Sequence, residues 1–148
     1  MKNEETLNVL RFNKFVLDIN LKDITNEDSL VSSGAGGNCL NWVLGHIVVS
    51  RNDINEIVGL DKIADENLVK LYESGSANIN PGNAEKIEKL LEIYNNSQKQ
   101  LEDRVAEIDL SGELKKMKML TFLAFHEAYH CGQIGLLRRI AGKEGAIK

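Results

Sequence analysis

Helical periodicity with almost no proline is the feature that most constrains the fold of this chain. Its 148 residues include a single proline, Pro81, although an average usage of about 5% would supply roughly seven. Proline removes a backbone donor and breaks helices, so its near absence permits long helices almost everywhere. Apolar residues recur at spacings of three and four in four segments, which is typical of amphipathic helices.

These segments predict four long helices, which we place at about residues 4–20, 38–58, 80–105 and 114–141. Asparagines are the predicted N-caps, Asn38 for the second helix and Asn80 or Asn83 for the third. The predicted core-facing stripes are, helix by helix, Val9, Phe12, Val16 and Ile19; Leu40, Val43, Leu44, Ile47 and Ile54; Ile87, Leu90, Leu91, Tyr94, Leu101 and Val105; and Leu120, Leu123, Ile134 and Leu137.

The segments between these helices are predicted to be connections. Residues 23–38 read as a polar, glycine-rich loop, and residues 61–79 as irregular with one or two helical turns around 68–72. Strand signals are thin. We therefore expect an all-α four-helix bundle that forms one domain over residues 1–148.

Charge and cysteine usage exclude several classes of function. The net charge is −4 and the sequence pI is about 5.4, so the chain lacks the cationic surface that nucleic-acid binding requires. No apolar run approaches the ~20 residues that a membrane-spanning helix needs, and the polar start of the sequence carries no signal-peptide pattern. Cys39 and Cys131 form no CxxC motif, which favours a reducing cytoplasm.

The three histidines are the strongest sign of chemistry. His126 and His130 are four residues apart on the predicted fourth helix, so they differ by only ~40° around its axis and share a face. His46 lies between Val43 and Ile47 of the second helix. Two facing helices can therefore present three imidazoles to one point, and three neutral nitrogens plus an open position are the ligand set of a catalytic zinc-type site. Histidines that merely fill the core remain the alternative.

The residues 126–130 also fit HExxH, the signature of zinc metalloproteases, with Glu127 as the general base. The extended signature is HExxHxxGxxH. Here Gly132 comes one residue early, and Leu136 stands where the third histidine belongs. No predicted sheet is present to bind a peptide substrate, so we give the protease interpretation little weight.

Three segments of the chain carry the motifs of a known family. The first is Asn41-Trp42-Val43-Leu44-Gly45-His46-Ile47. The second runs from His126 to Arg139 and has two histidines four apart, then Gly-Gln and a basic pair. Leu71-Tyr72-Glu73-Ser74-Gly75-Ser76 precedes the third predicted helix. Together they resemble the DinB/YfiT-like metalloenzymes, and the resemblance covers about residues 4 to 143.

This resemblance implies an up-down-down-up four-helix bundle whose long crossover joins the second and third helices. It implies a divalent metal ion, zinc or nickel, held by His46, His126 and His130, and a homodimeric assembly. Members of the family include thiol-dependent S-transferases and a mycothiol-dependent maleylpyruvate isomerase. Others are described as DNA-damage-inducible, which implies no contact with DNA.

The site chemistry fits more than one reaction. A divalent ion can lower the pKa of a bound water to about 7, and it deprotonates a coordinating thiol outright. We therefore expect a metal-dependent enzyme that acts on a small molecule, and a thiol-dependent S-transferase using a low-molecular-weight thiol comes first. A metal-dependent hydrolase and a non-catalytic metal- or ligand-binding bundle are the alternatives.

Five further residues flank the histidines. Gln133 could orient a bound ligand, and Glu127 either forms a salt bridge or assists catalysis. Asp53 is expected to be a solvated helix residue, although it could reach a group bound at the metal. Cys131 points ~100° away from His130 and is expected to pack as a small buried thiol. Aromatic rings at Trp42 and at position 129 could line the pocket.

Overall fold

The computed structural model describes residues 3–147, and within that range it contains six helices and no strands. The four long helices are α1 (Glu4–Leu21), α3 (Leu40–Val58), α5 (Ile87–Glu107) and α6 (Leu114–Ile140). Two short helices, α2 (Asn26–Ser29) and α4 (Glu66–Tyr72), lie in the connections. The prediction of an all-α protein is confirmed.

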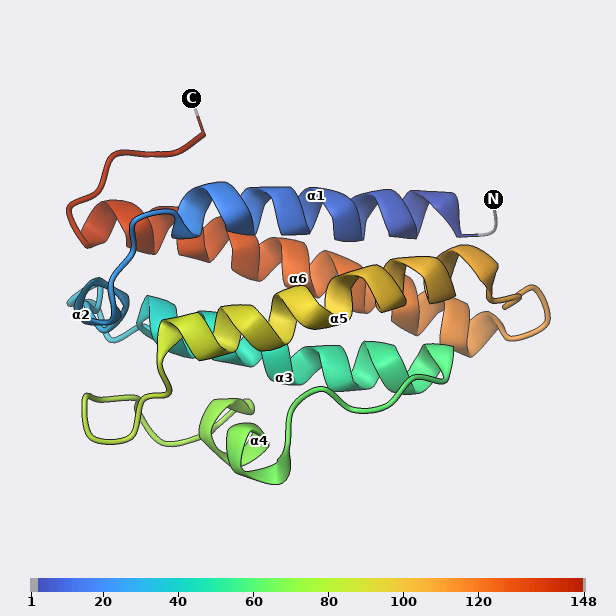
Figure 1. Ribbon diagram of the computed structural model, residues 1–148, viewed down its shortest axis with the longest axis horizontal. Helices are drawn as coiled ribbons and strands as arrows, with labels where there is room; N and C mark the ends of the chain where they lie inside the picture. The colour runs from blue at the N-terminus through green and yellow to red at the C-terminus, as the bar shows by residue number, and fades with distance from the viewer. Residues whose placement is uncertain (1–2, 148) are drawn as a thin grey trace.

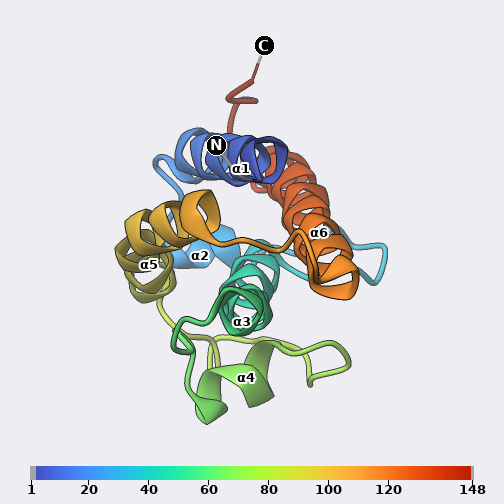
Figure 2. The ribbon, with the colours of Figure 1, turned by 90° about the vertical axis from the view of Figure 1, so that its right-hand side faces the viewer.

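The long helices lie side by side along the longest axis of the molecule (Figure 1). Helices α1 and α6 run in one direction, and α3 and α5 run in the other. Each contacts two neighbours, in the cyclic order α1, α6, α3, α5. The longest connection, residues 59–86, holds α4 against the outer side of α3 (Figure 2). Helix α6 therefore packs directly on both α1 and α3.

The interior of the bundle consists of two apolar clusters with polar residues between them. One cluster gathers the C-terminal halves of α1 and α6 with the N-terminal halves of α3 and α5, and the second gathers the opposite halves. At the boundary, each long helix contributes buried polar side chains, namely Asn13, Arg51, Ser97, Gln98 and Glu127.

The stripes predicted for the second and fourth helices are confirmed, because every residue in them is buried. The stripe of the third helix is also buried, apart from Leu91, which is half-buried. Helix α3 starts two residues after the predicted cap Asn38. Its N-cap is Cys39, and no side chain caps its first turn.

The stripe predicted for the first helix is wrong. Phe12 is 67% exposed and the other three residues are half-buried. The buried residues of α1 are Leu7, Leu10, Asn13, Leu17, Asn20 and Leu21. This face contains two asparagines, of which Asn13 donates to the carbonyl oxygen of Ala124 at 3.0 Å and Asn20 to that of Val16 at 3.0 Å. The apolar spacing pointed to the stripe from Val9 to Ile19 because no polar residue interrupts that stripe, whereas two asparagines interrupt the buried face.

The predicted start of the third helix is also wrong, since α5 begins only at Ile87. Asn80 and Asn83 stabilise a turn instead. The Oδ1 of Asn83 accepts from the backbone N of Asn80, and the Oδ1 of Asn80 accepts from the backbone N of Gly82, both at 2.8 Å. The cap of α5 comes from α2, a helix that the sequence did not predict, where Asn26 Oδ1 accepts from the backbone N of Ile87 at 2.8 Å.

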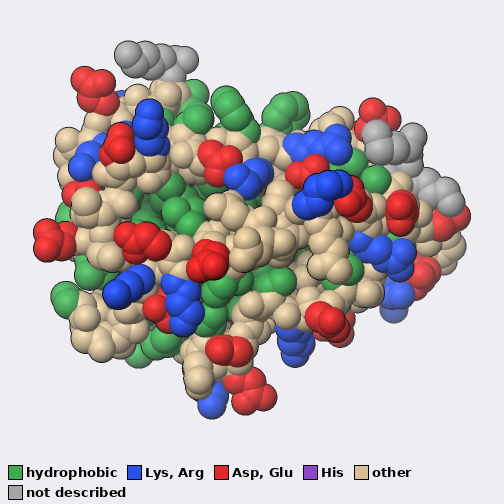
Figure 3. Space-filling model, in the orientation of Figure 1, with side chains coloured by type: hydrophobic (Ala, Val, Ile, Leu, Met, Phe, Trp, Pro, Cys, Tyr) green, Lys and Arg blue, Asp and Glu red, His purple; other side chains and the backbone are tan. Residues whose placement is uncertain are grey.

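On the face that Figure 3 shows, acidic and basic side chains are interspersed, and no continuous basic area is visible. None of the helices in residues 3–147 has the length and apolar character needed to cross a membrane.

Candidate metal centre

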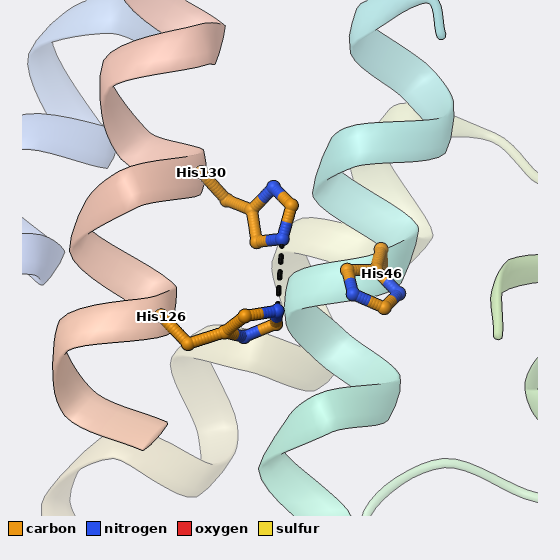
Figure 4. Close-up of side chains that lie close together, drawn as sticks. All are labelled: His46, His126 and His130. Atoms are coloured by element: carbon orange, nitrogen blue, oxygen red, sulfur yellow. Dashed lines mark hydrogen bonds between the residues drawn. The ribbon is translucent and has the colours of Figure 1, made fainter. Parts of the chain in front are cut away.

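Three imidazoles converge between α3 and α6. His46 belongs to α3, and His126 and His130 belong to α6 (Figure 4). One nitrogen from each ring lies within 4.8 Å of the other two. The Nε2 atoms of His126 and His130 are 3.1 Å apart. Tetrahedral zinc, with Zn–N bonds of about 2.0–2.1 Å, separates two ligand nitrogens by ~3.3 Å. The spacing of His126 and His130 therefore suits one divalent ion, and a nitrogen of His46 lies within 4.8 Å of both.

Two of the three rings have a defined tautomer, set by the partner of Nδ1. Nδ1 of His46 lies 2.8 Å from the carbonyl oxygen of Tyr72, and Nδ1 of His130 lies 2.7 Å from Oε1 of Gln133. Carbonyl and amide oxygens only accept, so each Nδ1 must donate. Each Nε2 then carries a lone pair, as a metal-binding histidine requires. The lone pair of His130 Nε2 accepts a hydrogen bond from His126 Nε2, which a bound ion would replace.

Burial keeps the imidazoles of α6 neutral. The pKa of His130 is lowered to about 4, and burial is the largest cause. The neighbouring histidines lower this pKa further, by less than burial does. The pKa of His126 is also lowered, first by burial and then by His46. A metal competes with protons for the same nitrogen, so rings that are neutral at pH 7 are ready to bind one.

The segment 41–46 shapes the α3 side of the centre. Trp42 stacks on His46, with the ring centroids 4.7 Å apart and the planes at 9°. Gly45 allows the Tyr72 ring to lie directly against α3, because a Cβ at this position would overlap that ring. Tyr72 Oη in turn donates to Asn41 Oδ1 at 2.8 Å. This contact places the carbonyl group that holds His46.

No fourth protein ligand joins the cluster. Among residues 3–147, only the three histidines form a group of His, Cys, Asp or Glu side chains that could hold a metal. Cys131 is 2% exposed and packs toward α1, where its Sγ lies 3.8 Å from the carbonyl oxygen of Asn13, and burial raises the pKa of its thiol. Asp53 is exposed. The packing predicted for Cys131 is thus confirmed.

Glu127 forms the salt bridge that was one of its two predicted roles. It is 3% exposed, and its two carboxylate oxygens accept hydrogen bonds from Nε and Nη2 of Arg51 at 2.8 and 2.9 Å. Tyr94 Oη donates to the same carboxylate at 3.1 Å. Both oxygens are therefore engaged, and the resemblance of this segment to HExxH does not extend to a free general base.

Gln133 Oε1 accepts the hydrogen bond from Nδ1 of His130 and thereby orients this histidine. Tyr129 is 58% exposed, and its ring stands edge-on to His130 with the centroids 5.2 Å apart, at the rim of the centre. A groove of about 290 Å³ opens beside His46, and Asp53 and Ser74 are among its lining residues. The centre thus adjoins a space of small-molecule size.

Sequence reasoning missed two residues that contact the histidines or their neighbours in the chain. Arg51 was not singled out, although a lone cation four residues after Ile47 on a buried stripe is a visible signal that it needs a partner. The carbonyl group of Tyr72 could not be identified, because any residue type supplies a carbonyl.

Comparison with known proteins adds no relative. No protein-family model, no curated protein and no solved structure matches the chain. The resemblance to the DinB/YfiT-like family therefore rests on the motifs alone. What the structure defines is an all-α protein with a buried three-histidine cluster that could hold a metal ion.

Proposed function

We propose that His46, His126 and His130 hold one divalent metal ion, zinc or nickel, and that the protein is a metal-dependent enzyme acting on a small molecule. The observation that carries this proposal is the convergence of three imidazoles with no fourth protein ligand in the described chain. Structural zinc sites have four protein ligands, whereas catalytic sites keep one position open. We assign the helices to the up-down-down-up bundle of the DinB/YfiT-like type.

Within this class, we favour a thiol-dependent S-transferase. A divalent ion supplies deprotonation of a thiol or a lowered pKa for a water in the open position. Hydrolysis often uses a nearby carboxylate to take up a proton from water, but the carboxylate of Glu127 is buried in its pair with Arg51. A coordinating thiol needs no such base. This observation favours the transferase over the hydrolase.

The chain's own residues hold the imidazoles in place and orient them. The carbonyl group of Tyr72 and the side chain of Gln133 each hold one imidazole by its Nδ1. The indole of Trp42 covers one face of His46 and keeps water from it. The groove beside His46 has room for a small molecule next to this histidine.

Metal analysis of the tag-free protein tests the binding part of the proposal. We expect about one divalent ion per chain, since three histidines make one ligand set. The variant His126→Ala should lose it. Asp53→Asn is the matched control, because Asp53 lines the groove but lies outside the histidine cluster. Equal trace metal in the wild type and in His126→Ala would show that the centre binds none.

An activity assay tests the reaction. The metal-loaded protein should accelerate the displacement of halide from a haloarene by a thiol, or the opening of an epoxide by a thiol to give the thioether alcohol, with glutathione, bacillithiol, mycothiol and cysteine tried in turn. The rate should collapse in His46→Ala, because two histidines from one helix remain and bind the ion more weakly. Metal-dependent ester or amide cleavage without thiol transfer would identify the hydrolase. If the protein has neither activity, the non-catalytic metal-binding bundle is the remaining alternative.

A further inference from the structure

Three of the polar residues between the two apolar clusters, Arg51, Gln98 and Glu127, form one connected network with the hydroxyl group of Tyr94. Arg51 is fully buried, and its guanidinium donates to Glu127, to Gln98 Oε1 at 2.7 Å and to Tyr94 Oη at 2.6 Å. It also lies 3.9 Å from the centroid of the Tyr94 ring. The network thus joins α3, α5 and α6 at a single level of the bundle.

The ion pair in this network lies on the same two helices as the candidate metal centre. Arg51 follows His46 by five residues on α3, and Glu127 lies between His126 and His130 on α6. The same two helices therefore carry both the ion pair and the three imidazoles. A rise of about 1.5 Å per residue means that Arg51 and His46 are held on one rigid rod, only ~7.5 Å apart along its axis.

We propose that Arg51 and Glu127 are positioning residues that set the register of α3 against α6, so that His46 meets the two histidines of α6. This inference rests on the proposed metal-binding function. The pair is bidentate, so it fixes rotation as well as sliding of the two helices. Apolar contacts around it are non-directional and tolerate small slips.

Because the pair is buried, it strongly opposes any shift in the register of α3 against α6. A slip by one residue would separate both N–O contacts and leave two charges unpaired in the apolar interior, which is strongly unfavourable. The same slip would carry His46 away from the other imidazoles by the same distance. Buried polar residues that specify register at a cost in stability are known in coiled coils.

The experiment replaces the network with apolar residues of similar size in Arg51→Met/Tyr94→Phe/Glu127→Leu. Apolar replacement of a complete buried ion pair often preserves stability, so we expect the metal-free variant to unfold at or above the wild-type temperature. Its zinc affinity should fall about 10- to 100-fold, as for other losses of support behind metal ligands. Bound cobalt should lose the intense visible bands of a tetrahedral site.

Asn13→Leu is the matched control. Asn13 belongs to the same buried level but joins α1 to α6, and therefore leaves the contact between α3 and α6 alone. It should change thermal stability and leave zinc affinity and the cobalt bands as in the wild type. Glu127→Gln, which keeps the length of the side chain and one acceptor oxygen, should bind zinc with intermediate affinity, and this variant carries the test if the triple variant does not fold.

The outcomes separate the two claims. A wild-type protein without zinc affinity overturns the proposed function and this inference with it. A wild-type protein that binds zinc, together with network variants that bind it equally tightly and give the same cobalt bands, overturns the inference and leaves the metal centre standing.

Discussion

At the scale of single residues, the centre combines burial with neutrality. His46 and His130 are 6% and 7% exposed, and each has one ring nitrogen held by an oxygen acceptor from the protein. The Nδ1–H group of such a ring already has its hydrogen-bond acceptor within the protein, so the neutral ring needs no water at this nitrogen. Protonation of His130 would place a charge in a poorly solvated position, next to two other imidazoles, and this cost lowers the stability of the metal-free protein at acidic pH.

The metal-free protein should lose stability as the pH falls from about 6.5 toward 4. The pKa of His130 is about 4 in the folded chain, against 6.5 for an unperturbed histidine. Between these values the unfolded chain binds a proton that the folded chain does not, so the contribution to the free energy of unfolding is complete above pH 6.5 and is lost on acidification. The full shift corresponds to on the order of 3 kcal/mol.

Urea unfolding across this pH range measures the effect. The variant His130→Leu is the control, because it removes the titrating ring and should flatten the dependence. A wild-type slope no steeper than that of the variant would contradict the prediction.

At the scale of elements, the N-terminal half of α3 is built around a close approach. Gly45 admits the ring of Tyr72, and Tyr72 Oη also accepts from the backbone N of Glu85 at 2.9 Å. The end of α4 and the segment before α5 are thereby tied to α3 at the level of His46. Helix α3 thus supplies His46, and the last residue of α4 supplies the carbonyl group that orients it.

Gly45→Ala should destabilise the protein by about 1–3 kcal/mol, the usual cost of overpacking a core, and should weaken metal binding, because displacement of Tyr72 moves the carbonyl group behind His46. Gly132→Ala is the matched control. A Cβ at Gly132 meets no atom within 4 Å, so this change should be neutral or add up to about 1 kcal/mol through helix propensity. Thermal unfolding and zinc titration of both variants measure this. Equal behaviour of the two variants would refute the role of the close approach.

The elements also show how far the sequence could predict the structure. Helices α3 and α6 were predicted well because their apolar spacing is sustained, and the convergence of the three histidines follows from those two faces. The start of α5 could not be read locally, since its cap is Asn26, 61 residues earlier in the chain. The partner of Arg51 is 76 residues away, on α6. Such pairings depend on packing, which local periodicity does not contain.

At the scale of the whole molecule, α6 is apolar on its outer side as well. Phe122, Phe125, Tyr129 and Leu136 are each more than half exposed. Between residues 119 and 137 the only charged side chain is Glu127, which is buried. A helix that is apolar all round is normally covered on every side, and exposed apolar patches commonly mark interaction sites.

We expect a second copy of the chain to cover this surface, so the homodimer stays a prediction that solution measurements can check. Light scattering on the eluting protein should give twice the chain mass of 16.5 kDa. Phe125→Lys should shift the protein toward the monomer, because it places a charge in the apolar surface. Lys99→Glu on α5, where the lysine side chain is 86% exposed, should leave the mass unchanged. A monomeric wild type would exclude the dimer.

The stacking of Trp42 on His46 has an optical consequence. The chain has one tryptophan, so all of its indole fluorescence arises beside the candidate metal centre. Indole emission is sensitive to the charge and the ligands of a ring stacked on it. Binding of an ion at Nε2 of His46 should therefore change the emission of the protein, so that its tryptophan fluorescence reports whether the site is occupied.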